Sequence, residues 1–293
     1  MTSPVNGLID FIRLKIFLFK NSINFDKNKD GARMVKLIRN DYFKTWKSML
    51  DIDIESSFTN LQKRELEPRS FTFYTSVSVM SSSKIEGEKL QVDSYVKHKL
   101  LNIEYLPELT EKPNDLYNAY LFAKDNSLNA QNFAEAHQLI SAHLLTERLR
   151  GKVRTTEMLV MEHKTGRIQY EACPLAIVNK QYEKLWSEIN DLIDSDLSHD
   201  EIFYYASYIH LVFVNIHPFS DGNGRSARLL EKWFLSEMLG ERAWYIQSEK
   251  YYYKNVDSYY KNLARVGMFY DELNYEKSLP FLLMLPQSLI MDN

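Results

Sequence analysis

The chain of 293 residues is 45% hydrophobic and 26% charged, a composition typical of a soluble globular protein. Its formal net charge of −3 provides no overall basic field, so we expect no nucleic-acid partner. A single cysteine, Cys173, excludes an internal disulfide framework and a metal site built from several cysteines, and it fits a cytoplasmic location. Nine glycines and eight prolines leave long stretches between turn signals, which favours a mainly α fold.

The first expected element is a helix within residues 8–19, which are rich in apolar side chains. Asp10, Arg13 and Lys15 interrupt this segment, and it is too short to cross a bilayer, so we expect no membrane span. The spacing favours an amphipathic helix that packs on the body of the protein, with binding to a membrane surface as the alternative.

Two domains are expected, an N-terminal helical extension of residues 1–69 and a helical domain of residues 70–293. Within the extension, residues 35–50 are predicted as a helix. Pro68 punctuates the chain before a run rich in serine and threonine, and a further helix is predicted after that run, at residues 84–101.

Farther along the chain, apolar spacing predicts helices at residues 114–124, 133–149, 182–193, 201–216 and 225–239. Asn132 is expected to cap the start of the second of these helices, and Gly240 to end the last. The helix at 201–216 is so apolar that we expect it to be central and buried. His210 within it is interpreted as a core histidine, because no third ligand suggests a zinc site with His217.

A different pattern follows residue 157. Two short strand-like runs, at residues 158–162 and 167–171, flank a turn that ends in Gly166. Glycine takes the positive φ that a tight turn needs. The sequence therefore predicts a β-hairpin that begins at Met158 and ends at Ala172.

The segment HPFSDGNGRSAR, from His217 to Arg228, combines features of a phosphate site. Gly222 and Gly224 allow the backbone to approach a ligand, and they lie where a helix begins, so free N–H groups and the helix dipole favour an anion there. Arg225 and Arg228 are three residues apart and share one side of that helix, where two guanidinium groups suit phosphate oxygens.

Three further residues of this loop carry chemistry. Asp221 is a lone carboxylate beside the basic cluster, and Mg²⁺ is typically held by one or two carboxylates together with substrate phosphates. Asn223 can donate a hydrogen bond to another oxygen, and neutral His217 can take a proton from a hydroxyl near pH 7. The letters DGNG alone would indicate an ordinary turn. A turn does not require a histidine, an aspartate, an asparagine and two arginines at these spacings.

The same segment resembles the signature of the Fic family, HPFxDGNGRxxR, at every specified position. The resemblance implies a compact α-helical core that transfers AMP from ATP to a serine, threonine or tyrosine hydroxyl. It implies that His217 deprotonates the hydroxyl, that Phe219 anchors the loop in the core, and that Asp221 holds Mg²⁺.

The resemblance also assigns the phosphate contacts. Asn223 and the backbone around Gly222 and Gly224 would hold the phosphates. Arg225 would contact them as well, and Arg228 would reach the γ-phosphate.

A second segment, SSKIEG, begins at Ser82 and ends at Gly87, and it resembles the inhibitory motif [S/T]xxxE[G/N] of the same family. It places the chain with the class whose inhibitory helix, here at about residues 80–100, precedes the core. The resemblance implies that Glu86 pairs with Arg228 and takes the guanidinium that ATP needs. ATP would then bind only in a pose that is poorly aligned for attack.

The hairpin lies where the family has its flap, at about residues 157–172, which pairs with a segment of the target protein. Gly151 and Arg154 match a GxxR-like pattern that often precedes the flap. The tyrosine-rich tail lies where the family borders the adenine, so Tyr252 and Asn255 are expected to contact the base or ribose. These two assignments compete with ordinary core packing of helical aromatics.

The leading interpretation is an autoinhibited protein adenylyltransferase that uses Mg²⁺ and ATP and acts on a target protein. Self-modification and a homodimer are compatible with it. Removal of AMP by the same site, or both reactions, is one alternative, and a non-catalytic nucleotide-sensing or interaction module is another. Other members of the family transfer other nucleotide fragments or phosphocholine.

Overall fold

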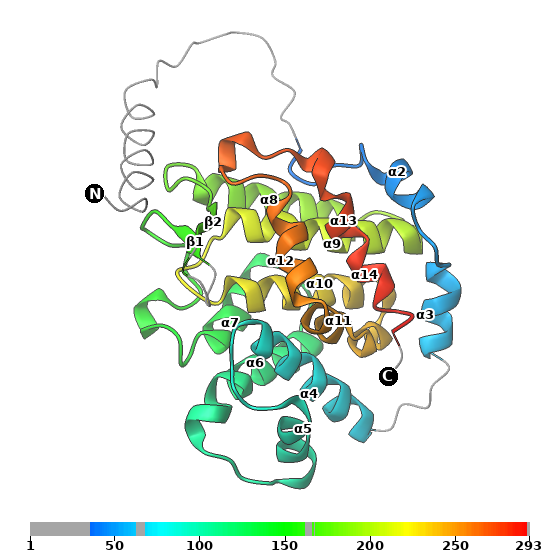
Figure 1. The fold of residues 1–293 in the computed structure, drawn as a ribbon. Coiled ribbons are helices and arrows are strands. Elements are labelled where there is room, and N and C mark those ends of the chain that lie inside the picture. Colours follow the sequence, from blue (N-terminus) through cyan, green and yellow to red (C-terminus); the bar gives the residue numbers. More distant parts are fainter. Residues whose placement is uncertain (1–35, 63–67, 162–165, 167, 292–293) are drawn as a thin grey trace, which may run out of the picture. The chain divides into compact units, whose positions relative to one another are not determined.

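The computed structural model describes residues 36–62, 68–161, 166 and 168–291, which fall in one compact unit (Figure 1). The helix expected within residues 8–19 lies outside the described residues, and so does most of the hairpin turn. The described chain is mainly α with one two-stranded antiparallel sheet, so the expected fold class is confirmed.

The helices are α2 (Phe43–Ser48), α3 (Ile54–Gln62), α4 (Pro68–Ile85), α5 (Val92–Leu101), α6 (Pro107–Asp125), α7 (Ala130–Ile140), α8 (Val178–Ile193), α9 (His199–Ile216), α10 (Asn223–Leu239), α11 (Ser248–Lys254), α12 (Val256–Ala264), α13 (Leu279–Leu282) and α14 (Met284–Gln287). The strands are β1 (Leu159–Met161) and β2 (Ile168–Glu171). Short 3-10 turns occupy Glu147–Leu149, Glu241–Tyr245, Tyr270–Glu272 and Tyr275–Ser278.

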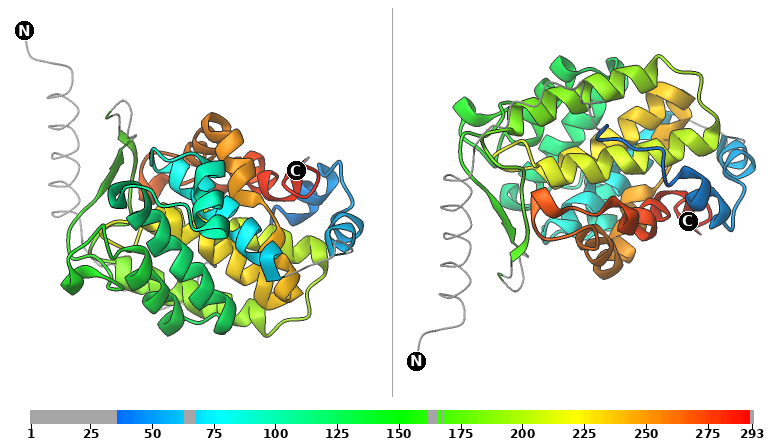
Figure 2. Two further views of the ribbon diagram at one scale, coloured as in Figure 1. Left: turned by 90° about the horizontal axis from the view of Figure 1, so that it is seen from below. Right: turned by 90° about the horizontal axis from the view of Figure 1, so that it is seen from above.

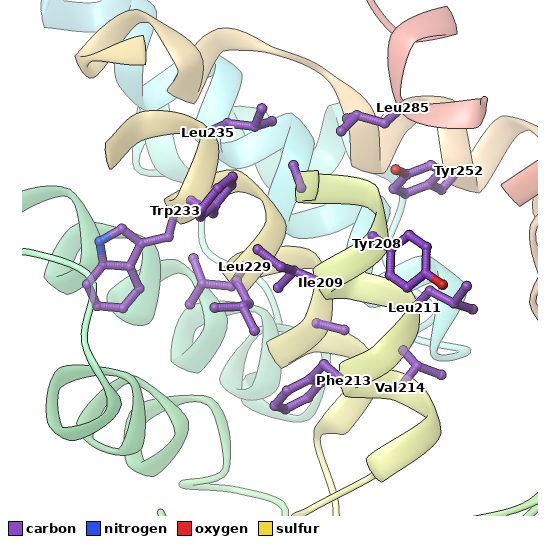
Figure 3. Packing of buried hydrophobic residues seen from close by; sticks show 14 of the residues in the cluster. Tyr208, Ile209, Leu211, Phe213, Val214, Leu229, Trp233, Leu235, Tyr252 and Leu285 are labelled. Carbon is purple, nitrogen blue, oxygen red and sulfur yellow. The ribbon is translucent and has the colours of Figure 1, made fainter. Parts of the chain in front are cut away.

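Helices α9 and α10 pack side by side at the centre of the unit (Figure 1). From Ile202 to Ile216, every side chain of α9 except that of Tyr205 is buried, because the helix is apolar on all sides and must be covered on all sides. In Figure 3, Ile209 of α9 and Leu229 of α10 point toward one another between the two helices. The expected central helix is therefore confirmed.

The other helices cover this pair. Helix α8 packs on α9, helices α4, α6 and α7 pack on α10, and α13 and α14 return to α9. Helices α2 and α3 also pack on α9, so residues 36–62 belong to the same body. The domain boundary expected at residue 69 stays a prediction. Within the described ranges, no helix has both the length and the apolar character that a bilayer span requires.

The prediction of one helix over residues 35–50 was wrong, because helix α2 covers only Phe43–Ser48. The backbone N–H groups of Leu37 and Ile38 donate instead to the two carboxylate oxygens of Glu188, at 2.9 and 2.7 Å. These two N–H groups therefore bind the side chain of Glu188 on α8 in place of backbone carbonyls within a helix. Trp46 then anchors α2, because its buried indole N–H donates to Leu282 O at 3.1 Å.

The helix predicted at residues 84–101, and the inhibitory helix expected at about 80–100, are divided in the structure between α4 and α5. The serine- and threonine-rich run, for which the sequence predicts no helix, is itself helical in α4. Ser76 Oγ returns to Thr72 O at 2.6 Å, which satisfies a buried hydroxyl inside the helix. The helix ends where Gly87 takes a φ of 91°.

Helix α7 starts earlier and ends earlier than the predicted range of residues 133–149. Its cap is Asn129, not Asn132, because Asn129 Oδ1 accepts the Asn132 N–H at 2.9 Å. Helix α10 begins at Asn223 and ends at Leu239, with Gly240 at a φ of 83°, so the expected stop is confirmed.

The predicted hairpin is confirmed as strands β1 and β2, with Val160 opposite Tyr170 and a bulge after Val160. Gly166 has a φ of 65°, as the turn requires. The hairpin lies at the end of the central pair where the chain passes from α9 to α10 (Figure 2). The fold therefore brings a strand pair next to the loop that carries the unusual chemistry.

Candidate active site

The loop between α9 and α10 is held closed by its own asparagine. Asn223 Oδ1 accepts the Phe219 N–H at 2.9 Å, and Asn223 Nδ2 donates to Phe219 O at 2.8 Å. Both polar ends of this buried side chain thus bind the loop backbone. The expected contact of the Asn223 side chain with phosphate stays a prediction, and in this structure its partner is the backbone of Phe219. The N–H groups in the first turn of α10 have no partner within the helix and remain suited to an anion.

Phe219 fixes the loop to the core. Its ring is fully buried and stacks on His137, with ring centroids 3.7 Å apart and an angle of 22° between the planes. Phe133 and Tyr182 pack around the same ring. The burial accords with the anchoring role expected for Phe219.

His137 of α7 is a site residue that no pattern in the sequence singles out. Its Nε2 lies 2.9 Å from Asp221 O and its Nδ1 lies 2.9 Å from Gly151 N. A carbonyl only accepts and an amide only donates, so Nε2 carries the proton. Burial lowers the pKa of His137 to about 4, which keeps it neutral. His137 therefore joins the loop to the segment before the hairpin.

Replacing His137 with phenylalanine is expected to destabilise the protein by about 2 kcal/mol, because the Asp221 carbonyl and the Gly151 N–H lose their partner. Urea unfolding followed by circular dichroism measures this change. The matched control is His199→Phe, at a partly exposed position at the start of α9. Equal stability of the His137 variant and wild type would contradict this role.

His217 ends α9 in the left-handed region, with a φ of 50°. Its Nδ1 lies 3.2 Å from Val214 O, so Nδ1 carries the proton and Nε2 is left as the basic nitrogen. Burial lowers the pKa of His217 to about 4, and the nearby Arg154 acts in the same direction. The imidazole is therefore neutral near pH 7 and able to take a proton.

Arg154 connects the loop with the base of the hairpin. Its side chain is buried and donates to three carbonyls, at His217, Thr156 and Cys173. The backbone N–H of Arg154 donates to Pro218 O at 2.8 Å. The arginine of the GxxR-like pattern thus ties together backbone segments around the site.

A cavity of about 400 Å³ opens above the loop. The turn after α4, the hairpin, the loop and helix α12 all contribute to its walls; among the lining residues are Glu86, Val160, Tyr170, His217, Gly224, Arg228, Tyr253, Tyr259 and Tyr260. A proton acceptor, the start of a helix and a guanidinium therefore share one space.

Arg228 is buried and its donors are engaged. Nε donates to Ser82 Oγ at 2.8 Å, and Nη2 donates to Ser82 O at 3.2 Å and to Glu86 Oε1 at 2.6 Å. Nη1 donates to the Tyr259 hydroxyl at 3.2 Å. Ser82 at the end of α4 and Glu86 in the turn after it thus hold the guanidinium from one side. The pairing of Glu86 with Arg228 agrees with the one that the family resemblance implies.

Gly224 leaves room for this contact. A Cβ at this position would clash with Glu86 Oε1 and approach Arg228 Nη1 to 3.4 Å. The carboxylate of Glu86 therefore lies against the first turn of α10, where the helix dipole favours negative charge.

Arg225 faces a different acid. Its Nη2 lies 3.1 Å from Glu88 Oε1, and the ammonium of Lys112 lies 3.2 Å from the same oxygen. Arg225 is buried and is not among the residues that line the cavity. Its expected contact with phosphates stays a prediction, and in this structure its ion-pair partner is Glu88.

Asp221 lies on the exposed face of the loop, and its Oδ1 accepts the Gly222 N–H at 2.6 Å. In the described ranges, no group of three or more histidine, cysteine, aspartate or glutamate side chains is placed to hold a metal. A single carboxylate fits Mg²⁺ when substrate phosphates supply the remaining ligands. The metal role of Asp221 stays a prediction.

The two residues suggested for the adenine do not line the cavity. Tyr252 is buried and its hydroxyl donates to Glu231 Oε2 at 2.8 Å, while Asn255 Nδ2 donates to Tyr251 O at 2.9 Å. Tyr253 lines the cavity instead. Successive residues of a helix point about 100° apart around its axis. The sequence of three consecutive tyrosines, Tyr251 to Tyr253, therefore does not reveal which one faces the site.

His210 lies in a buried network beneath the site, as expected for a core histidine. Its Nδ1 is 2.7 Å from Glu231 Oε2, and its Nε2 is 3.0 Å from the hydroxyl of Tyr259. Tyr259 in turn accepts from Arg228. A chain of hydrogen bonds therefore supports the guanidinium from below.

Residues 127–235 match the family model described as Fic/DOC family. A curated relative, Protein adenylyltransferase Fic of Nematostella vectensis, is 32% identical over 117 residues, which are 39% of this chain and 24% of the relative. The aligned part thus spans about a quarter of that relative's length.

Solved structures share the fold at lower identity. A Fic family protein from Desulfovibrio desulfuricans G20 superposes with a TM-score of 0.64 at 20% identity, over 86% of this chain and 72% of that one. A Fic domain containing signaling protein from Bacteroides thetaiotaomicron gives a TM-score of 0.60 at 18% identity, over 80% and 93% of the two chains. Fic-1 from C. elegans gives 0.58 at 16% identity, over 84% and 68%.

Proposed function

This chain is a Fic domain protein, and we propose that it transfers AMP from ATP to a serine, threonine or tyrosine hydroxyl of a target protein. One observation carries the proposal. A neutral histidine, His217, shares a cavity with the first turn of α10 and with the guanidinium of Arg228. Such a cavity can hold a nucleotide phosphate chain beside a proton acceptor.

The proposed reaction needs one proton transfer and one displacement. The target hydroxyl gives its proton to Nε2 of His217 as its oxygen attacks the α-phosphorus of ATP. The bond from that phosphorus to the bridging oxygen breaks, and pyrophosphate leaves. The free N–H groups at the start of α10, next to Gly222 and Gly224, are suited to the charge on the phosphate oxygens.

Mg²⁺ is the proposed metal, and Asp221 is the residue proposed to hold it. When bound, the ion would neutralise charge on the phosphates. The exposed carboxylate near the end of the loop, two residues before α10, supports this assignment, because Mg²⁺ keeps most of its sphere for water and phosphate oxygens.

Glu86 is proposed to inhibit the enzyme. It accepts from Arg228 at 2.6 Å, and with Ser82 and Tyr259 it engages the donors that a γ-phosphate would need. The carboxylate also brings negative charge to the place where the phosphate would lie, so it competes with ATP by occupation and by repulsion.

The hairpin is proposed to dock the target. Strand β1 pairs only with β2 in the described sheet, so its other edge is open to a strand from another chain. Val160 of β1 and Tyr170 of β2 line the cavity. A strand added at this edge would carry its hydroxyl past His217.

The proposal is tested by incubating the Glu86→Gly protein, Mg²⁺ and a cell lysate with ATP labelled either at the α- or at the γ-phosphate. AMP transfer predicts protein bands with the α label that have no counterpart with the γ label and that are absent when the Glu86→Gly, His217→Ala protein is used. Bands with the γ label that depend on His217 would instead indicate phosphoryl transfer, because kinases of the lysate add γ-label equally in both incubations. The absence of bands that depend on His217 with both labels would contradict the proposal. Loss of label from purified, AMP-modified target on addition of wild-type protein would identify the reverse activity.

The pH dependence of transfer is expected to reflect the lowered pKa of His217. Only neutral histidine accepts a proton, so activity is retained above the pKa of about 4 and lost as the pH falls through it. Tyr170, Arg154 and Glu86 face this imidazole, and Glu86 raises its pKa, so the Glu86→Gly variant keeps the same direction. Initial rates should change little from about pH 8 to about pH 5.5. A half-maximal rate near the ordinary histidine pKa would contradict this, with circular dichroism as the check on folding.

A further inference from the structure

The hydroxyl of Tyr170 meets the catalytic loop from the hairpin side. It donates to Val214 O at 3.2 Å and lies 3.1 Å from Nδ1 of His217, while that Nδ1 is itself 3.2 Å from Val214 O. The three atoms therefore form a closed triangle. Tyr170 is 7% exposed, and burial raises the pKa of its hydroxyl well above its usual range, so it stays protonated.

Two protons, one on the Tyr170 hydroxyl and one on Nδ1 of His217, satisfy the hydrogen bonds of this triangle. Val214 O only accepts, so the tyrosine proton goes to it, and the proton on Nδ1 is shared between Val214 O and the tyrosine oxygen. If the proton were on Nε2 instead, the single hydroxyl proton of Tyr170 could serve Nδ1 or Val214 O but not both, and the lone pair of Nδ1 would still face that carbonyl at 3.2 Å. The geometry thus favours the tautomer in which Nε2 is free to act as a base.

Tyr170 also connects this tautomer with the docking edge. It lies on β2 directly opposite Val160 of β1, and both side chains line the cavity that contains His217. The ring of Tyr170 meets the imidazole edge-on, with centroids 6.0 Å apart. A target strand that pairs with β1 would therefore bind to the same hairpin that places Tyr170 against His217.

We propose that Tyr170 is a positioning residue that fixes the tautomer and the orientation of His217, and that it aligns the base with a target bound at the hairpin. The proposal rests on the proposed function of His217. It assigns Tyr170 a part analogous to the third group of a catalytic triad, which holds a histidine without touching the substrate.

The first test is structural and needs no activity. In the full chain labelled with ¹⁵N-histidine, the two ring nitrogens of His217 should have widely separated shifts at pH 7, as expected for one tautomer. The His217→Ala protein identifies which of the seven histidines gives these signals. In Tyr170→Phe the two shifts should move toward each other, because the imidazole is then held at Nδ1 by Val214 O alone, can rotate away from that carbonyl, and populates both tautomers.

The second test is kinetic and uses the Glu86→Gly background. Tyr170→Phe is expected to lower kcat about tenfold, the effect of losing one hydrogen bond in the transition state, with the KM for ATP within about twofold. The matched control is Tyr208→Phe on α9, whose buried hydroxyl has no hydrogen-bond partner within the described residues. This control should leave kcat and the His217 shifts unchanged.

Unchanged ¹⁵N shifts in Tyr170→Phe would overturn the proposal, whether or not kcat falls, since a fall alone would then reflect packing. An equal fall in kcat for the Tyr208 control would overturn it as well. If the Glu86→Gly parent transfers no AMP, the proposed function fails, and the shifts still decide whether Tyr170 sets the tautomer.

Discussion

Replacing Glu86 with glycine is expected to raise the rate of AMP transfer by about 10- to 100-fold. Glu86 accepts a charge-assisted hydrogen bond of 2.6 Å from Arg228, and the side chain of Glu86 is only 23% exposed. Bonds of this kind are worth about 1.5–3 kcal/mol, and each 1.4 kcal/mol is a factor of ten. Once the carboxylate is gone, Nη2 of Arg228 and the space beside Gly224 become available to a γ-phosphate.

The measurement is incorporation of α-labelled ATP into protein at saturating Mg²⁺, with Glu104→Gly as the matched control. Glu104 is exposed, follows α5 and does not line the cavity. Only the Glu86 variant should be activated. ATP should also raise its melting temperature more than that of wild type, because a ligand that binds the native state stabilises it in proportion to its affinity. Equal rates for the Glu86 variant and wild type would remove Glu86 from the inhibitory role.

Replacing His217 with alanine in the Glu86→Gly background is expected to lower the rate of transfer by at least about 100-fold, the usual contribution of a general base. Nucleotide binding should be unchanged within about twofold, because the first turn of α10 and Arg228 are intact. His217 has its Nδ1 held by Val214 and leaves Nε2 as the base, so no other nitrogen of that side chain can substitute for it.

Single-turnover labelling measures the chemical step, and calorimetry with a non-hydrolysable ATP analogue measures binding. His98→Ala on α5 is the matched control, since His98 does not line the cavity. Transfer at the parent rate by the His217 variant would assign the base to another group. Loss of nucleotide binding together with transfer would indicate that the substitution had disrupted the loop.

The chemistry of the loop could be predicted from the sequence because it is contiguous. A central helix, a short turn and a second helix bring His217, Gly224 and Arg228 close together, and more distant segments complete the cavity that they line. His137 and Tyr170 could not be found in this way. His137 of α7 precedes His217 by 80 residues, and Tyr170 of β2 precedes it by 47 residues. Patterns within a single sequence do not encode contacts over such separations.

Two further features of the structure have local physical causes that the sequence pattern does not show. Asn223 has both a donor and an acceptor, and its residue type alone does not show whether these serve a ligand or, as observed, the backbone of Phe219. The serine-rich α4 was missed because serine favours caps and turns in isolation. Burial against α10 and α11 outweighs that preference, for example where Ser78 accepts from the buried ammonium of Lys232 at 2.9 Å.

Gly224 has a consequence for the mutational routes open to this protein. Any side chain at position 224 would collide with the Glu86 carboxylate, and it would also fill the space at the start of α10 where a phosphate is proposed to lie. A substitution of Gly224 is therefore expected to remove the proposed inhibitory contact and the proposed phosphate subsite together. If Glu86 inhibits as proposed, activating substitutions are expected at Glu86 and in the turn around it, outside the HPFSDGNGRSAR segment.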